Sequence, residues 1–275
     1  MSRRNAKIVS TAVLALLVVG ACLVSLFPVI WTFLTSIKSN VDAFAMPPKW
    51  IFQPTLSNYM NVFEKQPFGK YFFDSIVVAV VSTVVIMVVG SLGAYSVTRY
   101  QARGVEMGKY VLLFRMLPPM AIVLPVFILF RTYGMLDTYP GLIMVYTGFN
   151  LPFGIWMLMG FFQNLPMELE EAALVDGCSR YRAFWKVILP LASPGIAATS
   201  ILVLIQCWNE YLFALILTAR NVRTLPIGAS MFVQEHQILW GELTAAAILI
   251  MLPIFVAGLF VQRYLVRGLT VGALK

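Results

Sequence analysis

The sequence predicts an all-α polytopic membrane protein with six transmembrane helices and a cytoplasmic helix-turn-helix loop. Composition is the first observation behind this class. Of the 275 residues, 60% are hydrophobic and only 12% are charged, whereas soluble domains have roughly 45–50% and about 25%. Because so few charged groups cannot cover this much apolar surface, most of the protein must face lipid. A soluble globular fold is therefore excluded.

The second observation is the presence of six long apolar runs. They are residues 8–34, 73–97, 110–130, 142–162, 196–218 and 243–261. A helix needs about 20 apolar residues to cross a hydrocarbon core of about 30 Å, so each run predicts one span. Runs of this length favour helices over barrel strands. The first run is too long for a typical signal peptide, so we expect an uncleaved anchor. We expect residues 1–275 to form a single transmembrane domain.

The distribution of Lys and Arg predicts the orientation of the spans. If both termini are inside, the inner segments hold twelve of these cations and the outer segments seven, with Arg115 inside the third run. The positive-inside rule then places both termini in the cytoplasm. The net charge of +8 is scattered between apolar runs, which fits an anionic membrane face rather than nucleic acid. Arg115 lies six residues into its run, where its side chain can reach the cytoplasmic face.

Metal, disulfide and catalytic sites are not predicted. The three cysteines are far apart and there is one histidine, which is poor material for a metal cluster or a hydrolase triad. The segment GVEMGKY at residues 104–110 has three residues between its glycines, where a phosphate-binding loop has four. The chain is therefore not expected to bind ATP itself, and we expect no cofactor in it.

The cytoplasmic segment 163–194 is too long and too patterned for a plain connector. Pro166 suits the first position of a helix, and Gly177 supplies a left-handed stop. Acidic side chains complement the positive start of this helix: Glu168, Glu170 and Glu171. The pattern predicts a helix of about three turns. Such a helix is too short to be stable alone in water, so another surface must pack against it.

A second short helix is predicted after Gly177. Ser179 can cap it, and Pro190 and Pro194 should interrupt it as the chain returns to the membrane. Two interpretations of the resulting hairpin stay open from the residues alone. It can lie on its own bundle or on the lipid surface, or it can bind a separate partner.

This segment resembles the permease subunits of ABC importers, whose motif is EAA, three residues, Gly, nine residues and then I-x-L-P. Six residues of the chain match that pattern in register: Glu171, Ala172, Ala173, Gly177, Leu189 and Pro190. Val187 stands at the isoleucine position. Asp176 fits the version that is common in carbohydrate importers. The resemblance implies that the six matching residues and Asp176 couple the chain to an ATPase, with Ala172 and Ala173 permitting close seating.

Other segments resemble the MalG-type branch of sugar permeases. They are PTLSNY at residues 54–59, WNEYLFAL at 208–215 and GLTVGALK at 268–275. The resemblance implies a single permease domain in a bacterial inner membrane, with 163–194 as its coupling loop. It also implies a second permease, two ATPase subunits that carry ATP and magnesium, and an extracytoplasmic solute-binding protein.

Candidate pathway residues come from the polar stretch of the fifth run. Gln206, Asn209 and Glu210 are three and four residues apart, so a continuous helix would place them on one face. An ionised side chain there should avoid lipid and face a cavity or the bundle interior. Trp208 and Tyr211 can offer flat apolar faces to a sugar ring. A weaker stripe includes Tyr146 and Asn150. The alternative is that these polar groups lock helices together.

Together these observations predict an ATP-driven importer subunit for a neutral sugar, with a disaccharide such as trehalose or maltose as the narrowest expectation. Glycerol phosphate is an alternative substrate, although phosphate should recruit more cations to the path than Arg115. An ion-coupled secondary transporter that uses Glu210 is the alternative class. That class leaves the hairpin motif without a role.

Overall fold

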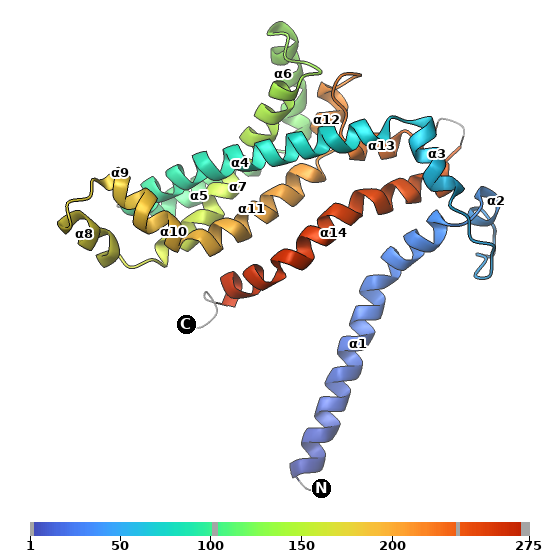
Figure 1. Cartoon of the computed structure of the whole chain (residues 1–275), viewed down its shortest axis with the longest axis horizontal. Helices are drawn as coiled ribbons and strands as arrows, with labels where there is room; N and C mark the ends of the chain where they lie inside the picture. Colours follow the sequence, from blue (N-terminus) through green and yellow to red (C-terminus); the bar gives the residue numbers. More distant parts are fainter. Residues whose placement is uncertain (1–2, 101–103, 235–236, 271–275) are drawn as a thin grey trace. The chain divides into compact units, whose positions relative to one another are not determined.

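The computed structural model describes residues 3–100, 104–234 and 237–270, and most of these are helical (Figure 1). The all-α class is therefore confirmed. Within the described residues, β pairing is limited to one isolated bridge between Val233 and Ile238. The tail motif at 268–275 lies outside the described residues from 271 onward.

The chain forms two compact units by its internal contacts. One consists of Met1–Phe68 with Gly228–Leu252, and the other of Gly69–Ile227 with Pro253–Lys275. Each unit is therefore discontinuous in sequence. The expectation of a single domain over 1–275 stays a prediction.

The first unit contains α1 (Arg3–Ser36), α2 (Asn40–Ala43), α3 (Ser57–Lys65) and the first part of α14 (Trp240–Thr270). The amide of Asn58 on α3 donates to the carbonyls of Ser36 and Lys38 at 2.8 and 2.7 Å, which satisfies acceptors at the end of α1. Lys65 Nζ lies 2.7 Å from Oε1 of the buried Glu242. These contacts attach the short helix α3 to the ends of α1 and α14.

The second unit is a bundle with a small hairpin at one end. Its helices are α4 (Phe68–Tyr100), α5 (Gly104–Arg115), α6 (Pro119–Thr132), α7 (Tyr139–Gln163), α8 (Glu168–Val175), α9 (Arg180–Ala183), the π-helix η1 (Phe184–Ile188), α10 (Leu189–Leu191), α11 (Ser193–Trp208) and α12 (Leu212–Leu217). α13 (Leu225–Ser230) crosses from this unit into the other. Both α5 and α11 pack on α7 (Figure 1).

Close approach of α4 and α7 depends on small residues. A Cβ added to Gly154 would lie 2.7 Å from Ile86 Cγ2, so only glycine fits there without a shift. On the facing helix, a Cβ added to Gly90 would be in ordinary contact with Ile155 and Leu158. Consequently the long helix α4 lies directly on α7 over this stretch.

The described residues contain four helices that are long and apolar enough to cross a membrane. These are Thr11–Ser36, Phe68–Tyr100, Tyr139–Gln163 and Trp240–Leu259. A fifth span results if Arg180–Leu191 and Ser193–Trp208, bent by 75°, count as one. α6 is apolar but shorter. The total of six spans therefore stays a prediction.

Two of the predicted runs are not continuous helices. The run 110–130 divides into α5 and α6 at residues 116–118, because Pro119 keeps Pro118 extended, with φ −64° and ψ 129°. The run 196–218 divides into α11 and α12 at residues 209–211.

Candidate coupling hairpin and pathway residues

The turn of the hairpin has the geometry that the sequence predicts. Gly177 has φ +82°, which is the left-handed region. Its N–H donates to Leu174 O at 3.0 Å, and Cys178 N–H donates to Ala173 O at 3.0 Å. These two bonds are the Schellman arrangement that closes a helix end. Gly177 as the stop of the first helix is therefore confirmed, although that helix, α8, begins at Glu168 and not at Pro166.

The second arm differs from the expectation at its proline. Ser179 Oγ accepts the N–H of Arg182 at 3.3 Å, as a cap should. However, the arm continues through Pro190, and the interruption lies at Ala192, just before Pro194 in the first turn of α11. The π-helix η1 directly precedes Pro190, and its wider turn accommodates a residue that has no N–H to donate.

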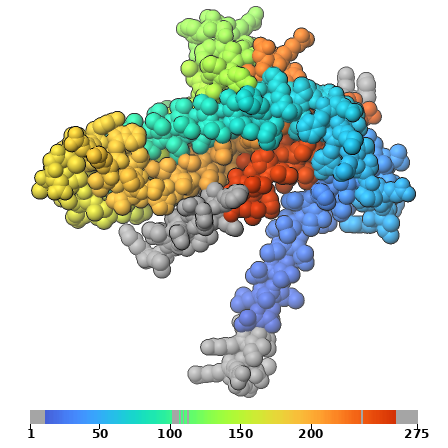
Figure 2. Space-filling view, in the orientation of Figure 1, coloured from blue at the N-terminus to red at the C-terminus, as the bar shows by residue number. Residues whose placement is uncertain are grey.

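The motif residues divide between the surface and the interior of the chain. Glu171, Ala172 and Asp176 are exposed, whereas Ala173 is buried within the chain. Pro190 is exposed and Leu189 is half-buried. The hairpin surface, yellow in Figure 2, thus presents Ala172 and not Ala173.

Glu170 is the functional candidate that sequence reasoning missed, because it was counted only as one acidic residue in the first turn. Its side chain is buried, and Oε1 accepts the hydroxyls of Tyr95 at 2.7 Å and Tyr100 at 2.9 Å. Arg99 Nε lies 3.5 Å from Oε2. Tyr95, Arg99 and Tyr100 all belong to the last turns of α4, so Glu170 fastens the hairpin to that helix.

Glu210 lies at the break in the fifth run. Its Oε1 and Oε2 accept the N–H groups of Phe213 and Ala214 at 3.0 and 3.2 Å. These are N–H groups of the first turn of α12, so the carboxylate caps that helix. Because α11 ends at Trp208, the expectation that Gln206, Asn209 and Glu210 share one face of a continuous helix is wrong. The cap gives the physical reason for the break.

Two of the pathway candidates are open to their surroundings. Asn209 is exposed, and its amide donates to Ile205 O at 2.8 Å. Tyr211 is exposed as well. Trp208, by contrast, is buried and packs edge-on against Phe72 with ring centroids 6.0 Å apart.

The weaker stripe on α7 is buried against the fifth run. Tyr146 and Asn150 are both buried, and Tyr146 Oη donates to the backbone carbonyl of Glu210 at 3.3 Å. The amide of Asn150 donates to Tyr146 O at 2.9 Å and lies 3.7 Å from Cys207 Sγ. The structure therefore brings Tyr146, Asn150 and Glu210 together, and these contacts join α7 to the break between α11 and α12.

Arg115 has partners inside the bundle. Its guanidinium donates to the side-chain oxygen of Gln206 and lies 4.6 Å from the ring centroid of Phe153. A cation over an aromatic face with an amide acceptor beside it has partners that a lipid-facing side chain lacks. The reach of Arg115 to the cytoplasmic face stays a prediction.

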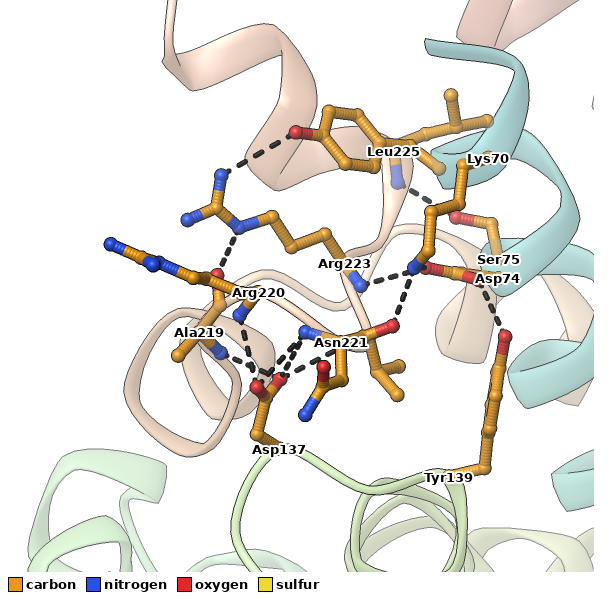
Figure 3. A network of polar contacts seen from close by, with 12 residues as sticks. Lys70, Asp74, Ser75, Asp137, Tyr139, Ala219, Arg220, Asn221, Arg223 and Leu225 are labelled. Carbon is orange, nitrogen blue, oxygen red and sulfur yellow. Dashed lines mark hydrogen bonds and ion pairs between the residues drawn. The ribbon is translucent and has the colours of Figure 1, made fainter. Parts of the chain in front are cut away.

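A polar network holds the opposite end of α4 (Figure 3). Asp74 accepts Lys70 Nζ at 2.8 Å, Tyr139 Oη at 2.6 Å and the N–H of Arg223 at 2.9 Å. Ser75 Oγ accepts the N–H of Leu225 at 2.7 Å. The first turns of α4 are thereby bonded to the start of α7 and to the loop after α12.

Asp137 holds the same loop from a second side. Its carboxylate accepts four consecutive backbone N–H groups, those of Ala219, Arg220, Asn221 and Val222, at 2.9–3.1 Å. Burial alone would raise the pKa of Asp137, but these N–H groups outweigh it, so the pKa is lowered from 3.8. The residue itself has φ 57°.

The family model for "Binding-protein-dependent transport system inner membrane component" matches residues 108–271. The chain belongs to this family. It is thus a permease of a binding-protein-dependent ABC importer, a multi-pass membrane protein. The resemblance stated from the coupling motif is confirmed, as is the MalG-type branch.

Three curated relatives cover almost the whole chain. The trehalose transport system permease protein SugB of Mycobacterium tuberculosis is 40% identical, with 96% of each chain covered. The trehalose/maltose permease MalG of Thermococcus litoralis is 35% identical over 94% of this permease and 96% of its own length. The sulfoquinovosyl glycerol permease SmoH of Agrobacterium fabrum is 34% identical over 91% and 89%.

A solved structure supports the fold. A bacterial ABC transporter chain involved in the import of the acidic polysaccharide alginate matches with a TM-score of 0.77 at 23% identity, covering 96% of the permease and 98% of that chain. Among the described residues there is no group of three or more His, Cys, Asp or Glu side chains that could hold a metal ion.

Proposed function

We propose that the permease moves a neutral sugar, such as the disaccharides trehalose or maltose, from a solute-binding protein to the cytoplasm by alternating access. In this proposal both termini are cytoplasmic. A second permease completes the pathway, and two ATPase subunits supply the energy with ATP and magnesium bound to them. The chain itself is a non-catalytic subunit of the translocase.

The exposed hairpin carries this proposal. Its left-handed turn at Gly177 presents Glu171, Ala172 and Asp176 on the surface, where an ATPase can contact them. A small side chain at Ala172 permits close approach, and the carboxylates can pair with cations of a partner. Ala173 and Leu189, which are more buried, would support this surface from behind.

For the pathway we propose a division of labour among the polar residues. Asn209 and Tyr211 are exposed, so they would contact the sugar through an amide and an aromatic face. The remaining candidates would shape the cavity because they already have partners in the bundle: Gln206, Trp208, Glu210, Tyr146 and Asn150.

The relatives leave the sugar class open between neutral and anionic substrates. Two of them carry trehalose in their names and one carries sulfoquinovosyl glycerol. A neutral sugar is favoured because the cation Arg115 is already engaged by Gln206 and Phe153. Glycerol phosphate would need that cation to be released.

An ion-coupled carrier that uses Glu210 is less well supported. The carboxylate of Glu210 is bonded to the N–H groups of Phe213 and Ala214, so a proton or sodium ion would compete with these N–H groups for its oxygens and weaken the cap of α12. The hairpin would also have no role in such a carrier.

Purification of the tagged chain in mild detergent tests the proposal. We expect a second permease and an ATPase to co-purify with it, and a binding screen on the accompanying solute-binding protein to identify a disaccharide. Isolation of the chain without any ATPase would contradict the importer assignment. Uptake that follows an ion gradient without ATP would support the carrier instead.

A further inference from the structure

We propose that Glu170 is a positioning residue that transmits movement of the coupling hairpin to α4, and that α4 carries it to the opposite end of the bundle. This inference rests on the proposed coupling of the hairpin to an ATPase. It adds a route through a helix that is distant in sequence from the hairpin. The route is defined by two sets of polar contacts, one at each end of α4.

The first set is the joint between Glu170 and the end of α4. Tyr95 and Tyr100 share Oε1 of Glu170, and their own hydroxyls lie 3.1 Å apart. Arg99 closes the other side of the carboxylate and donates to Leu165 O at 2.9 Å. Because the glutamate and the arginine are both buried, removal of either would leave an uncompensated charge. The joint therefore resists separation.

Aromatic packing joins α4 to the second arm of the hairpin as well. The ring of Tyr95 lies 4.8 Å from that of Phe184 in η1 and 6.1 Å from that of Phe162 at the end of α7. The guanidinium of Arg180 lies 4.9 Å from the ring centroid of Tyr100. Thus both arms of the hairpin, and not only α8, are held to the same two turns of α4.

Covalent continuity alone would carry hairpin motion into other helices. α7 precedes the hairpin directly, and α11 follows it across a bend of 75°. A bend of this size at Ala192 is a weak point for transmitting force along the chain. By contrast, α4 is a single helix of 33 residues, and it meets the hairpin through Glu170, which is 75 residues from Tyr95 in sequence.

The second set of contacts lies at the start of α4. Asp74 and Ser75 bond to the N–H groups of Arg223 and Leu225, and Lys70 Nζ donates to the carbonyl of Asn221. With a rise of 1.5 Å per residue, the 25 residues from Asp74 to Arg99 span about 38 Å, more than the hydrocarbon core. The predicted orientation places this end outside, on the side of the binding protein. α4 is consequently held at both ends by buried polar groups.

The joint is distinct from the docking surface of the hairpin. Glu170 and Glu171 are adjacent, but Glu170 points into the chain and Glu171 is exposed. Loss of the Glu170 joint should therefore leave ATPase binding intact and impair communication between the two sides of the membrane. Loss of the docking residues Glu171, Ala172 or Asp176 should instead weaken ATPase binding.

The test measures ATP hydrolysis by the purified full complex in lipid nanodiscs. The rate is compared without and with the solute-binding protein, which is purified from the same cells. We expect Glu170→Ala to keep the basal rate within about twofold while stimulation by the binding protein falls at least fivefold. Tyr95→Phe combined with Tyr100→Phe keeps both rings and should give an intermediate loss. Glu168→Gln is the matched control, because it removes an exposed carboxylate from the same turn, and it should behave as the unaltered complex does.

Full stimulation in an assembled Glu170→Ala complex would overturn the proposal. If Glu170→Ala does not assemble, the double tyrosine variant decides, and unaltered stimulation in it overturns the proposal equally. Failure of the proposed function has a different signature. In that case the unaltered chain co-purifies with no ATPase, or the unaltered complex is not stimulated by any binding protein.

Discussion

The carboxylate of Asp137 accepts the backbone N–H of Asn221, 84 residues further along the chain, with Oδ2 at 2.9 Å and Oδ1 at 3.1 Å. The neighbouring N–H groups of Ala219, Arg220 and Val222 point at the same carboxylate. One side chain therefore fixes the conformation of the loop that follows α12. This loop also carries Arg223 and leads to Leu225, the first residue of α13, and the N–H groups of both bond to the start of α4.

Replacement of Asp137 by Asn should loosen this loop. The amide offers one acceptor oxygen in place of two charged ones, so we expect the free energy of opening the loop to fall by about 1–2 kcal/mol. The loss is limited to this size because the site is partly exposed. Hydrogen exchange of the amides at 219–222 should then be roughly tenfold faster. Asn tolerates positive φ as Asp does, so the backbone at 137 stays unstrained. Unchanged exchange would show that the carboxylate does not hold the loop.

The same carboxylate predicts a pH dependence. Its pKa is lower in the folded protein than the ordinary 3.8, so near that pH the unfolded state binds more protons. The stabilisation is present above about pH 4 and is lost as the pH falls through the folded value. Opening of the 219–222 segment should become easier on acidification in the unaltered permease. The Asp137→Asn variant should lack this contribution, and identical pH profiles for the two proteins would count against it.

A side chain at Gly177 should strain the backbone of the turn without colliding with neighbouring atoms. An added Cβ at Gly177 would have nothing within 4 Å, so the cost of a side chain there comes from φ +82° alone. Gly177→Val should strain the turn by about 1 kcal/mol or more and reduce uptake while membrane insertion survives. Gly160→Ala is the control, because that site is equally open but helical, and it should transport normally. Normal transport by Gly177→Val would argue against the hairpin assignment.

The ion pair in the first unit predicts a strong coupling energy. Glu242 is fully buried, and Lys65 Nζ and Asn61 Nδ2 donate to its Oε1. Oε2 has no hydrogen-bond partner among the residues that the structure describes. Lys65→Met leaves this carboxylate without its cation and should destabilise the unit by about 2–3 kcal/mol. This cost is smaller than the cost of breaking a fully buried ion pair, because Lys65 is half-exposed. Adding Glu242→Gln should recover part of the melting temperature. Additive effects of the two changes would contradict the pairing.

Glu210→Gln distinguishes the two transport classes. Glutamine keeps one of the two acceptors that cap α12, so we expect a modest loss of stability of about 1 kcal/mol. Uptake into vesicles should still require ATP and be insensitive to collapse of ion gradients. If uptake by the unaltered permease depends on an ion gradient and uptake by Glu210→Gln does not, the protein is an ion-coupled carrier.

Sequence alone predicts a structural feature correctly where a single residue determines the local backbone conformation. The left-handed stop at Gly177 and the cap at Ser179 follow from chemistry that is visible within four residues. The apolar runs likewise predict the long helices α1, α4 and α7, because a hydrocarbon core of about 30 Å requires at least about 20 apolar residues in each.

Features that depend on distant partners could not be predicted in this way. Nothing near Glu170 in sequence indicates that Tyr95 and Tyr100 bind it, and its glutamate neighbours made it look like one more helix-start charge. The break at Glu210 was missed because the run is apolar enough for a continuous helix, and only the capping bonds show otherwise. Proline gave the opposite error at Pro190, where a π-turn lets the helix continue.

Photocrosslinking from Ala172 tests the central claim most directly. With a crosslinking residue at this exposed position in the purified complex, we predict a covalent adduct between the permease and an ATPase subunit, and none from the buried position Ala173. Adducts from Ala172 with lipid or with the permease itself, and none with an ATPase, would show that the hairpin lies on the membrane or on its own bundle. That result would contradict the account.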